Sequence, residues 1–160
     1  MLLAAYTAPT ERRPPMYTAA TERRPPIDDM TEHSNATRVR ELFAAFRRSD
    51  IDAVRAVIPE HAVWHFPGRR GRLAGTHRGR DAIFAFLLNV QALTDGTFHL
   101  DLIDVLANDT HAVALFRGHG VRNGKTLDNP TCLRMRLEEG QVVEVWEFVW
   151  DLYAVDEFWS

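Results

Sequence analysis

Two side chains in this sequence combine a type and a position that suit proton transfer, and Glu147 is the first of them. It interrupts a row of valines at alternate positions of a predicted strand. A carboxyl group among apolar side chains must find a polar partner or take up a proton. A protonated Glu147 would act as an acid or hold a ligand oxygen. The alternative is a structural carboxylate that Thr131, Asn129 or an arginine satisfies.

His65 is the stronger candidate of the two, and it lies in the short apolar stretch of residues 62–66. Imidazole exchanges protons near neutral pH, so a histidine at the mouth of an apolar cavity suits proton abstraction next to a carbonyl group. Such a general base contributes about 10²–10⁴-fold to a reaction rate. The alternative is a histidine that is hydrogen-bonded within the core or at its rim. Its neighbour Trp64 either packs in the core or contacts a ligand.

The remaining histidines do not predict a metal site, because their sequence positions do not form a metal-ligand spacing. His61 and His65 are four residues apart, but on a strand that spacing does not produce the chelating pair that it would on a helix. The single cysteine, Cys132, excludes an internal disulfide and a cysteine-cluster metal site. Residues 68–79 lack the flanking strand and spacing of a phosphate-binding glycine loop. We therefore expect neither a metal nor another cofactor. The histidines concerned are His61, His77, His99, His111 and His119.

Glu147 belongs to a predicted run of antiparallel strands over residues 110–151, whose first turn is Asn123-Gly124. This dipeptide predicts a two-residue type I′ turn, because both central residues of such a turn need positive φ. Side chains alternate between the two faces of a strand, so the turn also decides which of them face the core. The resulting core-facing pairs are Gly118 with Asn129, Phe116 with Thr131 and Ala114 with Leu133.

The second turn lies at residues 138–140, where Glu-Glu-Gly suits a three-residue loop that a left-handed glycine closes. This loop predicts that Leu133 pairs with Val145 and that Thr131 pairs with Glu147. The core face then includes Glu147, and a two-residue loop would reverse the two faces. The inner set is Val143, Val145, Glu147, Val149 and Asp151, and the outer set is Trp146, Phe148 and Trp150.

The segments before these strands read mostly as helices. Apolar stripes at helical spacing predict helices over residues 35–46, 51–58 and 79–93. Short apolar stretches between turn residues predict strands over residues 62–66 and 98–107. Residues 151–159 form a polar-aromatic tail with about one helical turn. Helices gathered before an antiparallel sheet predict an α+β fold, with three N-terminal helices packed on a strongly curved, conical sheet. We expect a cavity between the helices and the concave face.

The expected cavity wall combines apolar side chains with a few polar ones. Gly118 and Gly120 would leave room for a ligand on the inner face, and the alternative is a bend in the strand. For each apolar residue the alternative is simple core packing. Asn129 and Thr131 would hold the polar end of a ligand. The predicted ligand-binding residues are Trp64, Phe86, Leu87, Phe116, Gly118, Asn129, Thr131, Leu133, Val145 and Asp151.

Composition excludes several classes of function. Apolar residues make up 46% and charged residues 26% of the chain, which is typical of an ordinary globular domain. The net charge of −3 disfavours a general nucleic-acid binder. Apolar runs all fall short of the roughly 18 residues that a membrane span needs. Residues 1–6 are too short for a signal-peptide core, so we expect a cytoplasmic protein without a nucleic-acid or membrane partner.

Residues 1–30 contain a tandem duplication, because the stretch at 6–15 returns at 17–26 with a single difference, Pro9 against Ala20. Two short copies rich in proline, arginine and threonine cannot bury a core. We expect a disordered leader before a folded domain at 31–160. A proline-rich ligand for another protein and an arm that packs on the domain remain as alternatives.

From Thr37 to Asp151 the chain resembles the SnoaL-like and ketosteroid-isomerase-like branch of the nuclear transport factor two-like superfamily. The resemblance lies in residues 43–52 (FAAFRRSDID), 62–66 (AVWHF), 75–83 (GTHRGRDAI) and 139–148 (EGQVVEVWEF). It implies the conical fold and places His65 at the position of the isomerase base. The positions of the two isomerase oxyanion donors fall on Leu42 and Leu133, which cannot donate hydrogen bonds. The resemblance therefore implies the scaffold without the known catalytic sets.

Together these features predict a cofactor-independent acid-base enzyme of isomerase, cyclase or lyase type. Its substrate would be a small hydrophobic carbonyl or polyketide-like compound, with His65 as base and Glu147 as acid. The alternatives are a non-catalytic module that binds a hydrophobic ligand and a dimeric interaction subunit. An aromatic patch of Trp146, Phe148 and Trp150 is too large to remain exposed, so we expect a homodimer through the outer sheet face.

Overall fold

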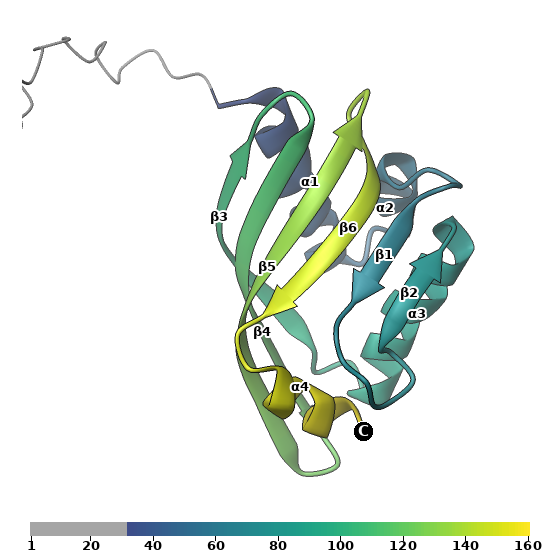
Figure 1. The fold of residues 1–160 in the computed structure, drawn as a ribbon, viewed down its shortest axis with the longest axis vertical. Helices are drawn as coiled ribbons and strands as arrows, with labels where there is room; N and C mark the ends of the chain where they lie inside the picture. The colour runs from purple at the N-terminus through teal and green to yellow at the C-terminus, as the bar shows by residue number, and fades with distance from the viewer. Residues whose placement is uncertain (1–31) are drawn as a thin grey trace, which may run out of the picture. The chain divides into compact units, whose positions relative to one another are not determined.

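A computed structural model describes residues 32–160, so the duplicated segment and the predicted leader lie outside the described residues. Figure 1 shows α1 and α2 behind the long strands and α4 beside the end of the β4–β5 hairpin. The elements in chain order are α1 (Ser34–Arg48), α2 (Ile51–Val57), β1 (Val63–Phe66), β2 (Gly75–Arg78), α3 (Arg80–Leu93), β3 (His99–Ala107), β4 (His111–Arg122), β5 (Lys125–Glu138), β6 (Gln141–Val149) and α4 (Leu152–Trp159). This arrangement confirms the predicted α+β fold.

The first two helices begin and end where short polar side chains and proline predict. Asp50 accepts a hydrogen bond from the backbone N–H of Ala53 and so caps α2. Ser49 ends α1 in the left-handed region at φ 55°. The α2 helix stops at Val57, before Pro59, which could not continue the helix. The buried side of α1 includes Val39, Leu42 and Phe43 from the predicted stripe.

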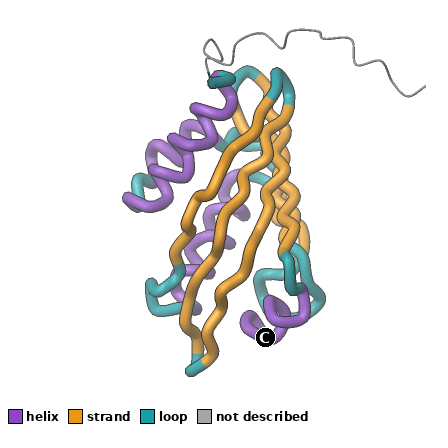
Figure 2. Tube along the Cα trace, turned by 90° about the vertical axis from the view of Figure 1, so that its left-hand side faces the viewer, coloured by secondary structure: helices purple, strands orange, loops and turns teal. Residues whose placement is uncertain are grey.

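The sheet has six strands in the order β2-β1-β6-β5-β4-β3. Strand β2 was not predicted, because its sequence, Gly-Thr-His-Arg, is too short and polar to stand out from the loop around it. It pairs with β1 in antiparallel fashion, and β1 pairs with β6 in parallel. Figure 2 shows the long strands bending across the molecule, with helices along one side. The concave, helix-covered side holds the core.

The first hairpin has the predicted register. Asn123 and Gly124 both have positive φ, as a type I′ turn requires. The predicted pairs of Gly118 with Asn129, Phe116 with Thr131 and Ala114 with Leu133 are all present.

The second hairpin differs from the prediction in its register. Its turn has two residues, Glu139 and Gly140, and Leu133 pairs with Glu147 instead of Val145. A β-bulge between Arg136 and Leu137 adds one residue to the opposite strand. The shorter loop alone would reverse the faces of β6, and the bulge restores them. Glu147 therefore keeps its predicted face although its predicted partner was wrong.

The C-terminal tail forms a full helix, α4, instead of one turn. Asp151 accepts a hydrogen bond from the backbone N–H of Ala154 and caps this helix. Val155, Phe158 and Trp159 lie on one face at spacings of three and four residues and are buried. The Arg122 side chain donates to the carbonyl oxygen of Phe158 and thereby ties α4 to the β4–β5 hairpin. Across residues 32–160, the helices are all too short or too polar to cross a bilayer.

Candidate active site

A cavity of about 640 Å³ opens between the concave face of the sheet and the helices. Its wall is largely aromatic and aliphatic, and its exposed members, such as Arg47, Ile51 and Leu88, mark the opening. Eight of the ten predicted ligand-binding residues border it. They are Trp64, Phe86, Leu87, Phe116, Gly118, Asn129, Thr131 and Leu133.

Glu147 brings one of the two carboxyl groups of β6 into this cavity, and the other, Glu144, lies outside it. Its Oε2 accepts a hydrogen bond of 3.3 Å from the indole Nε1–H of Trp64. Burial raises the pKa of Glu147 from 4.5 to about 7, and the Trp64 hydrogen bond opposes that rise only partly. The side chain keeps some exposure because it borders the cavity. At neutral pH the cavity therefore holds a carboxyl group that both gives and takes a proton.

Packing holds the Trp64 indole in the position from which it donates its hydrogen bond to Glu147. It is buried on β1, opposite Val145 in the parallel pairing of β1 with β6. Its ring packs against Phe86 of α3 with centroids 5.7 Å apart. Since Phe86 also borders the cavity, one aromatic contact holds both the wall and the indole donor in place.

Asn129 and Thr131 form the other polar part of the wall, and both are buried. The Asn129 side-chain amide donates to Thr131 Oγ1 over 3.1 Å, and its Oδ1 accepts from the backbone N–H of Asp151 over 3.2 Å. These two side chains therefore bond to each other and to backbone. The hydrogen-bond partner of the Glu147 carboxylate is the Trp64 indole, rather than the predicted Thr131, Asn129 or arginine.

His65 lies on the opposite face of β1 from the cavity, so its predicted position at the cavity mouth was wrong. Strand alternation explains the error, because Trp64 and Phe66 face inward and the residue between them must face outward. His65 Nε2 lies 3.2 Å from Glu144 Oε1, and its ring stacks on Trp146 at 3.8 Å between centroids. The His65 hydrogen bond is the main reason that the pKa of Glu144 is lowered. The structure does not bring His65 and Glu147 together.

Two further predicted wall residues lie outside the cavity. Val145 is buried in the core, where its neighbour across the sheet is Met135. Asp151 lies just beyond the end of β6 and is exposed, and its carboxylate caps α4. Alternation along the last predicted strand placed both residues on its core face, but neither of them borders the cavity.

The predicted role of the glycines on β4 also needs correction. A Cβ atom on Gly118 would lie 3.4 Å from the Phe98 ring, and one on Gly120 would lie 3.1 Å from it. Phe98 fills the space beside Gly120 and part of that beside Gly118, although Gly118 still borders the cavity. Phe98 and Trp159, whose rings are 5.7 Å apart, close this end of the cavity. The sequence signal that could have placed Trp159 on the cavity wall is the spacing of Val155, Phe158 and Trp159, which puts them on one face of a helix.

Comparison with known proteins decides the family. Residues 39–145 match the family model described as the SnoaL-like domain. An uncharacterised protein of Mycobacterium tuberculosis is 33% identical over 132 residues, which cover 82% of this chain and all of that protein. The chain belongs to the SnoaL-like domain family.

Solved structures share the fold of this SnoaL-like domain. Bal32a, from a soil-derived mobile gene cassette, is 40% identical with a TM-score of 0.76, over 79% of this chain and 96% of that one. A protein of unknown function with a cystatin-like fold from Xanthomonas campestris is 26% identical with a TM-score of 0.75, over 80% and 99% of the two chains.

The SnoaL-like cavity lacks hydrogen-bond donors at the two positions that the isomerase resemblance implies. Leu133 borders the cavity directly opposite Glu147 on the neighbouring strand. Leu42 is buried on α1. Neither side chain stabilises a developing oxyanion, so the chemistry available here centres on the Glu147 carboxyl group.

Proposed function

We propose that this SnoaL-like domain binds a small, mostly apolar carbonyl compound and that Glu147 moves a proton to or from it. The observation that carries the proposal is a protonatable carboxyl group on the wall of an otherwise largely apolar cavity. A general acid or base is most efficient when its pKa lies near the working pH. With a pKa of about 7, Glu147 meets that condition in neutral solution.

The size and chemistry of the cavity support a small hydrophobic ligand. Ligand sites commonly enclose about 300–1,000 Å³, and this cavity falls within that range. Phe43, Phe86 and Phe116 supply flat apolar surface on separate elements. Polycyclic or long-chain carbonyl compounds of polyketide type fit this wall better than highly charged metabolites do, because most of the wall offers no polar partner to replace lost hydration.

The proposed step is proton abstraction next to the carbonyl group. The ionised Glu147 carboxylate takes a proton from the α-carbon, and the electron pair of that C–H bond forms an enolate. The protonated carboxyl then returns the proton to the same or a conjugated carbon, which gives exchange or isomerisation without a cofactor. The Trp64 indole orients the carboxyl through its hydrogen bond. The absence of an oxyanion donor at Leu133 makes this a slower catalyst than one with a donor there.

Deuterium exchange tests this step without knowledge of the natural substrate. A panel of apolar cyclic ketones in D₂O, followed by proton NMR, should lose α-proton signals faster with the protein than without it. The rate should rise with pH through about 7, because ionised Glu147 is the base. Glu147→Gln, which keeps the shape and the hydrogen-bond acceptor, should lower the catalysed rate by about 100-fold or more. The matched control is Glu144→Gln, on the outer face of the same strand, and it should keep the rate within about twofold.

A non-catalytic binding module is the second candidate, and Leu133 opposite Glu147 is the observation that favours it. In that case Glu147 would donate a hydrogen bond to a ligand oxygen in its protonated form. Ketone binding that weakens as the pH rises through about 7, without any α-proton exchange, would favour this candidate over catalysis.

We also propose that the outer face of the sheet pairs two copies of this chain. In the described domain α1, α2 and α3 cover the other face (Figure 1). Trp146 is 39% exposed, Phe148 54% and Trp150 85%. Charges of both signs border this apolar patch, with Arg134 and Arg136 near Glu144. A two-fold dimer brings the same patch of both copies together, and charges of both signs let an arginine of one copy face the glutamate of the other.

Changing Trp146 and Phe148 together to Ser should convert a dimer to a monomer, because it removes two of the three aromatic side chains of the patch. Sedimentation velocity measures the change. The matched control, Ile51→Ser with Leu88→Ser, removes exposed apolar side chains from the helix side and should leave the dimer intact. A wild-type protein that sediments as a monomer at all concentrations would contradict the proposal.

A further inference from the structure

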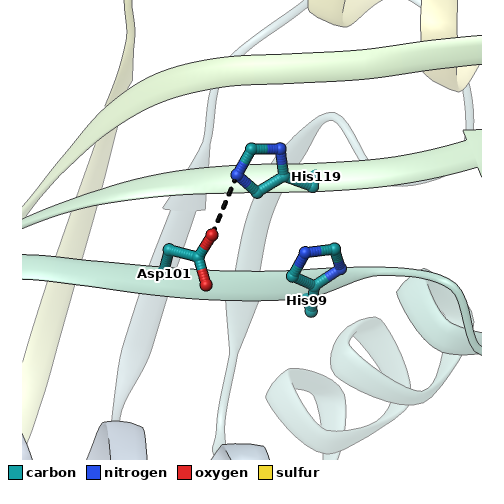
Figure 3. Close-up of side chains that lie close together, drawn as sticks. All are labelled: His99, Asp101 and His119. Carbon is teal, nitrogen blue, oxygen red and sulfur yellow. Dashed lines mark ion pairs between the residues drawn. The ribbon is translucent and has the colours of Figure 1, made fainter.

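A second group of ionisable side chains lies on the outer face of the sheet at its β3 edge. Pairing of β3 with β4 places His99 directly opposite His119, with Asp101 two residues further along the same face. One ligand atom from each of the three side chains lies within 4.8 Å of the others. Figure 3 shows the two rings and the carboxylate gathered across the two strands.

Sequence spacing could not reveal this group, because its two histidines are twenty positions apart and meet only through the hairpin. Strand β3 is the sheet edge, and two strands, β4 and β5, separate it from the aromatic residues of β6. The group is also distinct from Glu147, which faces the other side of the sheet. His99 also borders the cavity, whereas Asp101 and His119 do not, so the group forms a site of its own beside the cavity.

An acceptor oxygen lies beside Nδ1 of each imidazole and leaves Nε2 free to bind an ion. His99 Nδ1 lies 3.1 Å from the carbonyl oxygen of Thr97, which can only accept, so Nδ1 carries the hydrogen. His119 Nδ1 lies 3.5 Å from Asp128 Oδ1, and Arg117 Nε in turn lies 3.2 Å from that same oxygen. A carbonyl or carboxylate behind one ring nitrogen is the arrangement that orients metal-binding histidines.

The second ring nitrogen of His119 also lies beside a carboxylate. Its Nε2 lies 3.1 Å from Asp101 Oδ2. Two lone pairs at this distance repel unless a proton or a cation lies between them. Two atoms bound to one zinc ion at about 2.1 Å each lie about 3.0–3.4 Å apart, so the observed separation suits ligands of one ion. The His99 and His119 rings are nearly parallel, with centroids 4.9 Å apart and an interplanar angle of 17°.

We propose that His99, Asp101 and His119 bind one divalent transition-metal ion, with Zn²⁺ as the representative. Two imidazoles and one carboxylate are a donor set that zinc accepts, and three protein ligands leave a coordination position for water or another ligand. Asp101 is 66% exposed, so the ion would be reached directly from solvent. Small movements of these side chains would bring all three ligand atoms to bonding distance from one ion. Because the ion must pull the side chains together, we expect moderate affinity rather than the high affinity of a structural zinc centre.

Zinc titration of the full chain, without an affinity tag and after treatment with a chelator, tests the proposal. Calorimetry should give one site per chain with a micromolar dissociation constant. His99→Ala and His119→Ala should each weaken zinc binding by about tenfold or more, because each removes a ligand outright. His111→Ala is the matched control, since it removes another histidine from β4 and should leave the affinity unchanged.

A second measurement does not depend on the variants. In the wild-type protein with ¹⁵N-labelled histidine, zinc should shift the Nε2 resonances of His99 and His119 and leave those of His65 unshifted. Absence of binding up to about 1 mM zinc would overturn the proposal and identify the group as an ion-pair network around His119. Binding of equal affinity to the His99→Ala/His119→Ala double variant would overturn it as well, because the ion would then lie elsewhere.

Discussion

Glu147→Gln should leave stability nearly unchanged at about pH 4 and raise it relative to wild type by about 2–3 kcal/mol at about pH 8. The folded-state pKa of Glu147 is about 7, above its unfolded value of 4.5. Between these values the folded protein binds more protons than the unfolded chain, so the wild-type free energy of unfolding falls as the pH rises. This difference between the folded and unfolded pKa values corresponds to a loss of roughly 3 kcal/mol in the free energy of unfolding once the carboxyl is fully ionised. Glutamine has no such loss because it does not ionise.

Urea denaturation of both proteins at the two pH values measures this difference. Glu144→Gln is the matched control on the same strand, and its pH dependence should have the opposite sign. The pKa of Glu144 is lowered by His65, so its contribution is present above pH 4.5 and disappears as the pH falls through the folded value. A Glu147→Gln difference that stays constant with pH would mean that the carboxylate is ionised and satisfied in the folded protein.

Trp159→Ala should lower the free energy of unfolding by about 3–5 kcal/mol. The indole is only 4% exposed, borders the cavity and packs against both Phe98 and Phe158. Its loss removes the contact that holds α4 over one end of the cavity. Because the void joins the existing cavity, the surrounding side chains cannot collapse to fill it.

Tyr153→Ala provides the control for this prediction, because Tyr153 lies on the same helix and is 89% exposed. It should change the free energy of unfolding by no more than about 0.5 kcal/mol. Thermal and urea unfolding measure both variants, and binding of an apolar fluorescent ketone reports whether the cavity has opened. A Trp159→Ala protein as stable as the control would show that α4 is not part of the cavity wall.

The sequence predicts this fold well where local chemistry decides the backbone. Asn123-Gly124 specifies a turn with positive φ at both positions, and the pairing of β4 with β5 follows from it. Asp50 and Pro59 specify the start and end of α2 in the same way. The alternation that follows from the hairpin placed five wall residues on the cavity, namely Phe116, Gly118, Asn129, Thr131 and Leu133.

Prediction fails where the outcome depends on contacts between distant segments. The bulge opposite Arg136 compensates for the shorter Glu139-Gly140 loop, and periodicity carries no signal for such a bulge. His65 was placed by its spacing from α2, and one residue of difference along a strand moves a side chain to the other face. The meeting of His99 and His119 also depends on strand register rather than on sequence spacing.

Chemical assignment was less complete than fold assignment for the same reason. Glu147 could be recognised because a carboxyl group in a row of valines is unusual in itself. Its partner could not, since Trp64 reaches it from a parallel strand that begins some eighty residues earlier in the chain. The filling of the glycine gap by Phe98 likewise depends on how β3 packs beside β4.

The pKa of Glu147 in the intact protein tests the central claim most directly. Carbon-13 NMR of protein labelled at the glutamate side-chain carboxyl, with Glu147→Gln used to assign the signal, follows its ionisation directly. The account predicts a midpoint near pH 7 that shifts when an apolar ketone occupies the cavity. A midpoint near 4.5, unaffected by such ketones, would contradict it, because the carboxylate would then be hydrated or paired and the cavity would hold no proton donor.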